Sequence, residues 1–157
     1  MRPEIRGCIN IYRNEDFLVL APLLGSSLNF DLLNWYPTDL SHEEMGRLAF
    51  EGLDESYKYT KRSSNEEVLF ESNYNDWVRF TKEKFKYKSD RAMFTNMCSC
   101  LIARKDFEIE IRIPVHKKMK TWYGLLESKK IPHNLDFFEF GSEIRHLIDR
   151  AYAEEFS

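Results

Sequence analysis

The sequence predicts an α+β protein in which an antiparallel sheet is packed by about three helices. Segments with the alternating or apolar character of strands occur in adjacent pairs, as in hairpins, and the helical segments stand apart from them. In addition, one helix-start pattern occurs twice, at 37–46 and 132–141, each time after such a pair. We therefore expect one domain over residues 1–157, and the repetition indicates two related strand-strand-helix halves.

The repeated pattern has a helix cap, a glutamate and a glycine in the same register. Ser41 with Glu44, and Asp136 with Glu139, have the spacing of a capping box, which predicts helices over 42–57 and 136–154. The leucine before each cap can pack onto the residue four places after the cap, as in a hydrophobic staple. Both copies therefore start a helix.

Each copy also carries a glycine within the first two helical turns, Gly46 and Gly141. Glycine costs roughly 1 kcal/mol relative to alanine inside a helix. Its presence in both copies indicates that the helix backbone lies very close to another backbone segment at this point. We expect that segment to belong to the sheet.

The other elements follow from periodicity. The clearest strand is 107–113, where isoleucines alternate with charged residues until Pro114 ends the run. A second helix is predicted to begin at a cap formed by Asn75 and Asp76. The remaining strands are predicted at 5–12, 17–20 before Pro22, 98–103 and 122–131.

Composition favours a folded protein of the cytoplasm. Of its 157 residues, 43% are hydrophobic and 15% aromatic, which excludes a disordered chain, and no apolar run reaches the roughly 18 residues of a membrane span. We see no export signal at the start. Three cysteines are an odd number, and Cys98 and Cys100 share one face of a strand, so we expect reduced, buried thiols.

The motifs of catalysis are missing from the sequence. It has no glycine-rich phosphate loop, His-Glu-x-x-His, Cys-x-x-Cys or Gly-x-Ser-x-Gly pattern. The histidines are scattered, and the carboxylates of helix 42–57 lie at solvated positions where burial cannot tune a pKa for acid–base work. We therefore predict no enzyme activity, no catalytic residues, no cofactor and no metal site.

Charge is segregated along the chain. Residues 1–56 carry ten acids against four bases, whereas residues 79–130 carry fourteen bases against six acids. Helix 42–57 and the segment before it hold the densest acids, and a block of one sign can steer a partner of the other sign. The candidate binding residues are Asp31, Asp39, Glu43, Glu44, Glu51, Asp54 and Glu55. For any one of them, keeping an amphipathic helix in solution is an equally good explanation.

An alternative function is the binding of single-stranded nucleic acid. Lysines interleave with aromatic residues over 82–91, and three lysines precede Trp122 and Tyr123 in the segment 116–123. Bases that contact phosphates beside rings that stack on nucleobases suit a single strand. The negative net charge of −3 argues against this alternative.

Several stretches together resemble a known family. They are Leu40 to Gly46 running into Leu53-Asp-Glu-Ser56, then Tyr87-Lys-Ser89, Ala92 to Cys98, Ile109 to Pro114, Trp122-Tyr-Gly124 and Leu135 to Gly141. From about residue 40 onward the chain resembles CdiI-type immunity proteins of contact-dependent growth inhibition. The first 35 residues match less well, and the shared motifs are structural.

The resemblance implies a function. Such proteins are small, bacterial and cytoplasmic, and each neutralises the toxin domain of a matching CdiA protein. Those toxins are commonly nucleases, and several similar immunity proteins are associated with ribonuclease toxins of the EndoU class. A scaffold without catalytic motifs but with acidic patches suits a stoichiometric blocker of a basic nuclease, because carboxylates can stand in for phosphates.

Overall fold

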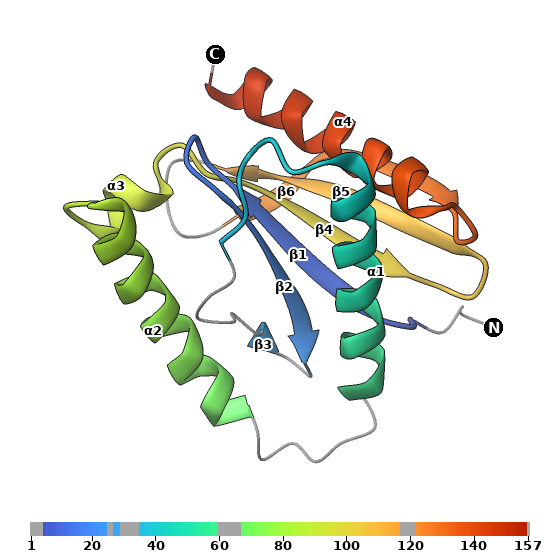
Figure 1. Cartoon of the computed structure of the whole chain (residues 1–157), viewed down its shortest axis with the longest axis horizontal. Coiled ribbons are helices and arrows are strands. Elements are labelled where there is room, and N and C mark those ends of the chain that lie inside the picture. Colours follow the sequence, from blue (N-terminus) through green and yellow to red (C-terminus); the bar gives the residue numbers. More distant parts are fainter. Residues whose placement is uncertain (1–4, 25–26, 29–34, 60–66, 117–121, 157) are drawn as a thin grey trace.

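The computed structural model describes residues 5–24, 27–28, 35–59, 67–116 and 122–156, with side chains over 5–23, 35–58, 75–113 and 128–152. Strands and helices follow one another along the chain as expected for an α+β protein (Figure 1). In order they are β1 (Cys8–Arg13), β2 (Leu18–Leu24), β3 (Ser27–Leu28), α1 (His42–Tyr59), α2 (Glu67–Phe85), α3 (Asp90–Phe94), β4 (Cys98–Arg104), β5 (Glu108–His116), β6 (Trp122–Pro132) and α4 (Phe137–Phe156).

The strands form one antiparallel sheet in the order β3-β2-β1-β4-β5-β6. β1 is central, and its Ile11 pairs with Leu20 of β2 on one side and Cys100 of β4 on the other. The predicted α+β class is confirmed. A hairpin precedes each capped helix, β1–β2 before α1 and β5–β6 before α4, with the short β3 between β2 and α1.

Two hydrophobic cores lie on opposite faces of the sheet. The larger core joins alternate residues of the strands, among them Ile11 and Ile111, to the inner faces of α1 and α4. The smaller core takes the other face of β1 and β2 and packs it against α2 and α3, with Trp77 fully buried at its centre. Accordingly, α2 and α3 stand apart from α1 and α4 on the other flank of β2 (Figure 1).

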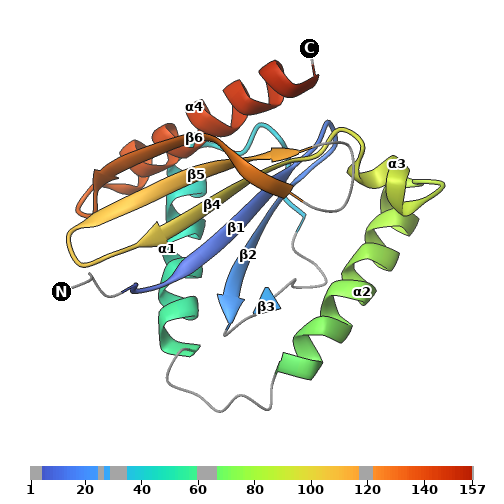
Figure 2. The same ribbon diagram turned by 180° about the vertical axis from the view of Figure 1, so that it is seen from behind.

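The rear of β4, β5 and β6 faces the viewer in Figure 2 with none of the described helices in front of it. On this face Glu110 of β5 is paired with Lys105 at 3.4 Å and with Arg112 at 3.3 Å. Cys98 and Cys100 belong to the opposite, buried face and are reduced thiols, as the alternation predicted.

The two helix caps are confirmed. The Ser41 hydroxyl accepts a hydrogen bond from the Glu44 amide at 3.2 Å, and the Asp136 carboxylate accepts one from the Glu139 amide at 2.7 Å. Leu40 and Leu135, the predicted staple residues, pack against the core that contains Met45 and Phe140. Each helix begins at the residue after its cap.

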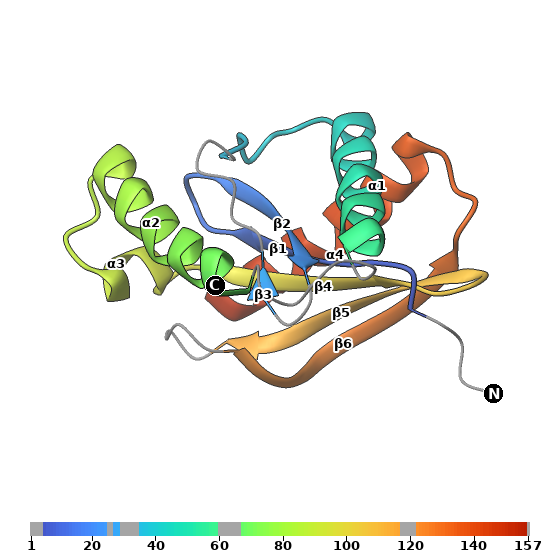
Figure 3. The ribbon, with the colours of Figure 1, turned by 90° about the horizontal axis from the view of Figure 1, so that it is seen from below.

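The glycines do make close contact with backbone, but the predicted partner was wrong. A Cβ added to Gly46 would lie 1.8 Å from the carbonyl oxygen of Phe137, and one added to Gly141 would lie 1.7 Å from that of His42. Each glycine therefore meets the first residue of the other helix. The amino-terminal turns of α1 and α4 cross in direct backbone contact, and Figure 3 shows α4 passing behind α1.

β2 continues past Pro22, which was predicted to close it. Leu18 exchanges both backbone hydrogen bonds with Tyr36, each at 2.8 Å, on the side away from β1. Backbone groups alternate in direction along a strand, so the nitrogen of Pro22 also points away from β1. Pro22 therefore removes no hydrogen bond of the β1–β2 ladder.

β5 likewise continues past Pro114 to His116. Pro114 lies where the β5–β6 register shifts, between Ile113 and Val115. At such an irregularity a strand has no ladder bond to lose, so the missing amide is tolerated. The prediction that Pro114 ends the strand was wrong for this reason.

The predicted cap at Asn75 and Asp76 was also wrong, since α2 begins at Glu67 and both residues lie inside it. Asp76 instead pairs with Arg79 at 3.2 Å, one turn further along the helix. Trp77 and Thr81 are buried against the smaller core, and this burial stabilises the helix here even though Asn75 and Asp76 favour turns and helix caps.

Removing either cap should destabilise the protein. Ser41→Ala or Asp136→Ala leaves a helix amide without its acceptor, so each should lower the free energy of unfolding by roughly 0.5–2 kcal/mol. Denaturant midpoints measure the loss. Unchanged midpoints for both variants would contradict the role of the caps.

Adding a methyl group at the helix crossing should be costly. In an ordinary helix Gly→Ala stabilises by about 1 kcal/mol, but Gly141→Ala should instead destabilise by at least about 2 kcal/mol because the new Cβ meets backbone. Gly52→Ala is the matched control, since its Cβ would meet a side-chain methyl of Ile9 at 3.0 Å. Thermal unfolding of the two variants should show the larger loss for Gly141→Ala, and the reverse order would refute the crossing.

Candidate binding surface on helix α1

Helix α1 is held rigidly at its carboxyl-terminal end as well as at its crossing with α4. The buried Ser56 hydroxyl accepts a hydrogen bond from the Cys8 amide at 3.0 Å and donates one to the Leu23 carbonyl at 2.6 Å, which ties α1 to β1 and β2. Gly7, with φ +115°, lets β1 approach the Leu53 carbonyl. The outer face of α1 is therefore displayed on a fixed support.

The predicted acidic residues of α1 share this outer face. Helical geometry places positions 43, 44, 51, 54 and 55 within about 120° of one another. Exposure agrees, since Glu44 is half-buried and the other four are exposed. Asp39 is also exposed, in the turn before the helix, whereas Asp31 lies outside the described residues. We call Asp39, Glu43, Glu44, Glu51, Asp54 and Glu55 the acidic face.

Arg47 lies within the acidic face and neutralises part of it. Its guanidinium donates to both carboxylate oxygens of Glu44, at 3.1 and 2.6 Å, and to Glu51 at 2.7 Å. The hydrogen bond from Arg47 lowers the pKa of Glu44 and, with the bond to Glu51, raises the pKa of Arg47. The Glu44 carboxylate is thus engaged with Arg47 one turn further along α1.

Asp54 is paired from outside the helix, by the guanidinium of Arg104 at 2.8 Å. Neither arginine was among the predicted site residues. The spacing of Arg47, three residues after Glu44 and four before Glu51, could have revealed it. Arg104 stands at the end of β4, and only the tertiary fold brings it to α1.

The structure brings together two histidines that appeared scattered in the sequence. His42 and His146 line a shallow hollow of about 500 Å³ between the start of α1 and the outer side of α4, together with Ser142, Arg145, Asp149 and Arg150. Arg145 donates to the carbonyls of Thr38 and Leu40, so it fastens the segment before α1 onto α4.

The basic segment 82–91 is built into the fold. Phe85 stacks on Phe17 with ring centroids 4.9 Å apart, and both belong to or border the smaller core. The Tyr87 hydroxyl donates a hydrogen bond to Asp16 and accepts one from Asn14 at 2.8 Å, and burial is the main cause that raises the pKa of Tyr87.

Of the basic side chains in this segment, Lys82 is paired with Asp90 at 2.5 Å. Both rings of the segment and Lys82 are thus engaged within the fold, which weakens the nucleic-acid alternative. Residues 117–121 of the second basic segment lie outside the described part.

Among the residues with described positions, no three His, Cys, Asp or Glu side chains gather as metal ligands would. None of the described helices is long and apolar enough to cross a membrane.

The fold and surface define a small α+β protein whose candidate site is a charged helix face. The sequence matches the CdiI family, described as CDI immunity protein, over residues 8–151. The chain belongs to that family. The match begins in β1 and so covers the amino-terminal hairpin as well, further than the resemblance from residue 40 indicated. No curated protein sequence matches the chain.

Two solved structures share the fold. One is titled a protein of unknown function, NMB0488, from Neisseria meningitidis, with a TM-score of 0.74 and 20% identity over 96% of this chain and 97% of that one. The other is titled a CdiA-CT/CdiI toxin and immunity complex from Yersinia pseudotuberculosis, also with a TM-score of 0.74 and 20% identity, over 94% and 99% of the two chains. At this identity the likeness concerns the fold.

Replacing Arg47 should release the carboxylate that it holds. In Arg47→Gln the pKa of Glu44 should rise toward its ordinary value, because a charged donor is lost. An NMR titration of the Glu44 carboxyl carbon measures the shift. No change in the pKa of Glu44 would contradict the pairing.

Proposed function

We propose that this chain is an immunity protein that binds the toxin domain of a matching CdiA-type protein and neutralises it in the cytoplasm by covering its active site or substrate-binding surface. Its membership of the CdiI family supports binding to a toxin. The Yersinia pseudotuberculosis structure, which shares the fold, also supports binding to a toxin, since its title describes a toxin and immunity complex. Inhibition then comes from binding alone, without catalysis or a cofactor.

We further propose that the toxin is a nuclease, and a ribonuclease in the first instance. Enzymes that grip nucleic acid expose basic clefts that contact phosphates. The observation that carries this proposal is the gathering of carboxylates on one face of α1, a rigid helix fixed by the crossing with α4 and by Ser56. Because that helix is already ordered, docking its carboxylates costs little beyond the ordering of the side chains themselves.

The acidic face is the proposed contact surface, with Glu43 and Glu55 exposed on it and Glu44, Glu51 and Asp54 oriented by arginines. The arginine pairs do not cancel the negative charge of the acidic face. α1 carries five acids against Arg47 and Lys58, so the face remains negative. A surface pair of this kind contributes only about 0–1 kcal/mol and can be exchanged for a pair with a partner.

Charge reversal on the acidic face should slow binding. Glu51→Lys with Glu55→Lys should slow association with the toxin domain at least about tenfold at low salt, and less at high salt, because steering between opposite charges is screened. Stopped-flow or surface-binding kinetics with the purified matching toxin domain measure the rate. The melting temperature should stay nearly unchanged, since the Arg47–Glu51 pair is exposed.

The matched control is Glu15→Lys with Glu83→Lys, two exposed acids on the β1–β2 turn and on α2. Both double variants take the formal net charge from −3 to +1, so a general charge effect would slow them equally. Equal rates for the two would remove the acidic face from the interface. Toxin activity on RNA and on DNA, titrated with wild-type protein, should fall to zero at about one chain per toxin, and a failure to inhibit would refute the function itself.

A further inference from the structure

Two adjacent phenylalanines at the start of α4 are exposed. Phe137 is 43% exposed and Phe138 is 58% exposed, although both belong to a helix whose inner face is fully buried. Among the described residues the exposed large hydrophobic side chains are few, and these two are neighbours in the chain. Adjacent exposed rings mark a surface that meets a partner more often than isolated ones do.

Other residues supply the core contact and the cap at this end of α4. Phe140 fills the core, Asp136 caps the helix, and Leu135 packs against the core as the staple residue. The backbone of Phe137 touches Gly46 through its carbonyl group, and that contact does not involve the aromatic ring. The cap and the fully buried core position of this helix start are therefore occupied by residues other than Phe137 and Phe138.

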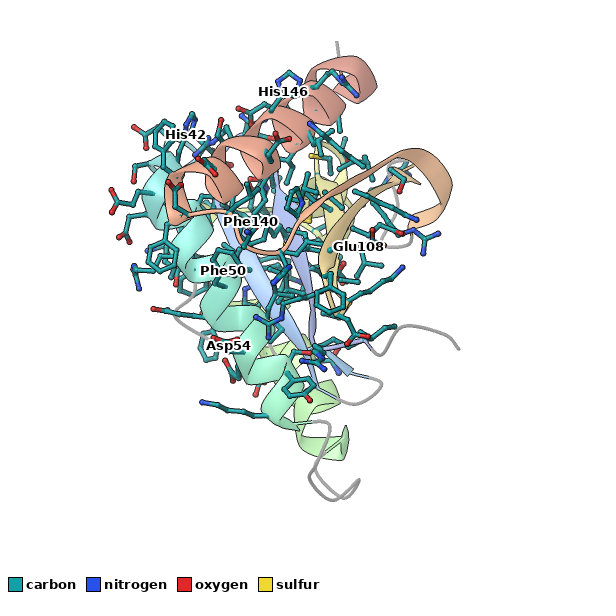
Figure 4. All side chains as sticks on the ribbon, turned by 90° about the vertical axis from the view of Figure 1, so that its right-hand side faces the viewer. His42, Phe50, Asp54, Glu108, Phe140 and His146 are labelled. Carbon is teal, nitrogen blue, oxygen red and sulfur yellow. The ribbon has the colours of Figure 1, made fainter. Side chains whose placement is uncertain are left out.

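Each exposed ring makes an aromatic contact with α1. Phe137 lies 5.9 Å from the half-buried Phe50, and Phe138 lies 5.2 Å from His42, both measured between ring centroids. In Figure 4 Phe50 lies along α1 between His42 and Asp54, on the side toward α4 and Phe140. We call His42, Phe50, Phe137 and Phe138 the aromatic ridge.

The aromatic ridge borders the acidic face. Phe50 is three residues after Arg47, four before Asp54 and seven after Glu43, and these spacings place all of them on adjoining parts of the α1 surface. The ridge is thus an apolar strip with carboxylates along one side. An interface with a desolvated aromatic centre and a charged rim has this arrangement.

From this juxtaposition we propose that the aromatic ridge is the anchor of the toxin interface and that it receives an arginine-bearing basic surface of the toxin domain. This inference rests on the proposed function and adds the residues that hold the partner in place. A guanidinium stacks on aromatic faces while its N–H groups reach carboxylates, so an arginine can use Phe138 or Phe50 and the acidic face together.

The hollow on the other side of the ridge contains an arginine that is already paired within the chain. Its Arg145 is committed to the carbonyls of Thr38 and Leu40 and lies 4.0 Å from Asp149. Asp149 also faces Arg13 at 3.5 Å. The positive charge of Arg145 is therefore compensated within the chain.

The test separates anchoring from steering. Phe138→Ala, and Phe137→Ala with Phe138→Ala, should raise the dissociation rate of the complex with the toxin domain at least about tenfold, because anchors act mainly on dissociation. The increase should be nearly independent of salt, in contrast to the effect of charge reversal on association. Phe138→Tyr keeps the ring and should dissociate within about threefold of wild type.

Phe80→Ala is the matched control, since Phe80 is a 37% exposed phenylalanine on α2, on the other flank of the molecule. It should leave the dissociation rate unchanged. If wild-type protein binds and neutralises the toxin while Phe138→Ala dissociates at the wild-type rate, the anchor is refuted and the immunity function stands. If wild-type protein does not bind the toxin domain, the proposed function fails first and the anchor fails with it.

Discussion

The crossing of α1 and α4 is the constraint on which the rest of this structure depends. Gly46 of α1 meets the carbonyl of Phe137, the first residue of α4, and Gly141 of α4 meets the carbonyl of His42, the first residue of α1. The two helices therefore contact each other through equivalent positions near their amino-terminal ends. Only glycine permits this approach, because any Cβ would overlap backbone. Once the two helices are fixed together, their inner faces close the larger core over the sheet. Their outer faces are left side by side, which brings the carboxylates of one next to the phenylalanines of the other.

Local signals in the sequence predicted the parts of the fold that local physics determines. Ser41 and Asp136 cap helices because a cap needs only a side chain and an amide three residues on. The predicted partner of the glycines was wrong, since spacing along the chain cannot distinguish a sheet from another helix. The start of α2 was missed because Trp77 and Thr81, through their burial, override the turn preference of Asn75 and Asp76.

The candidate site shows the same division. The acidic residues of α1 could be assigned to one outer face from helical periodicity alone, and Arg47 lay within reach of the same reasoning. Arg104 and the aromatic ridge could not be found in this way, because each joins segments far apart in the sequence. The arginine pairs also change how the face acts. Long-range steering follows net charge, which Arg47 and Arg104 reduce, so tight binding must draw on apolar contact as well.

The two copies of the helix-start pattern differ in the side chains that follow the cap. Both keep the cap, the glutamate and the glycine, which hold the two helix starts in place. At the two positions after the cap, however, one copy has His42 and Glu43 and the other has Phe137 and Phe138. Glu43, Phe137 and Phe138 are exposed and His42 is half-buried, and polar residues are the usual choice at such positions. One helix start therefore contributes charge and the other contributes aromatic surface. Their crossing sets the two beside each other, which is the arrangement that the proposed binding of a basic partner uses.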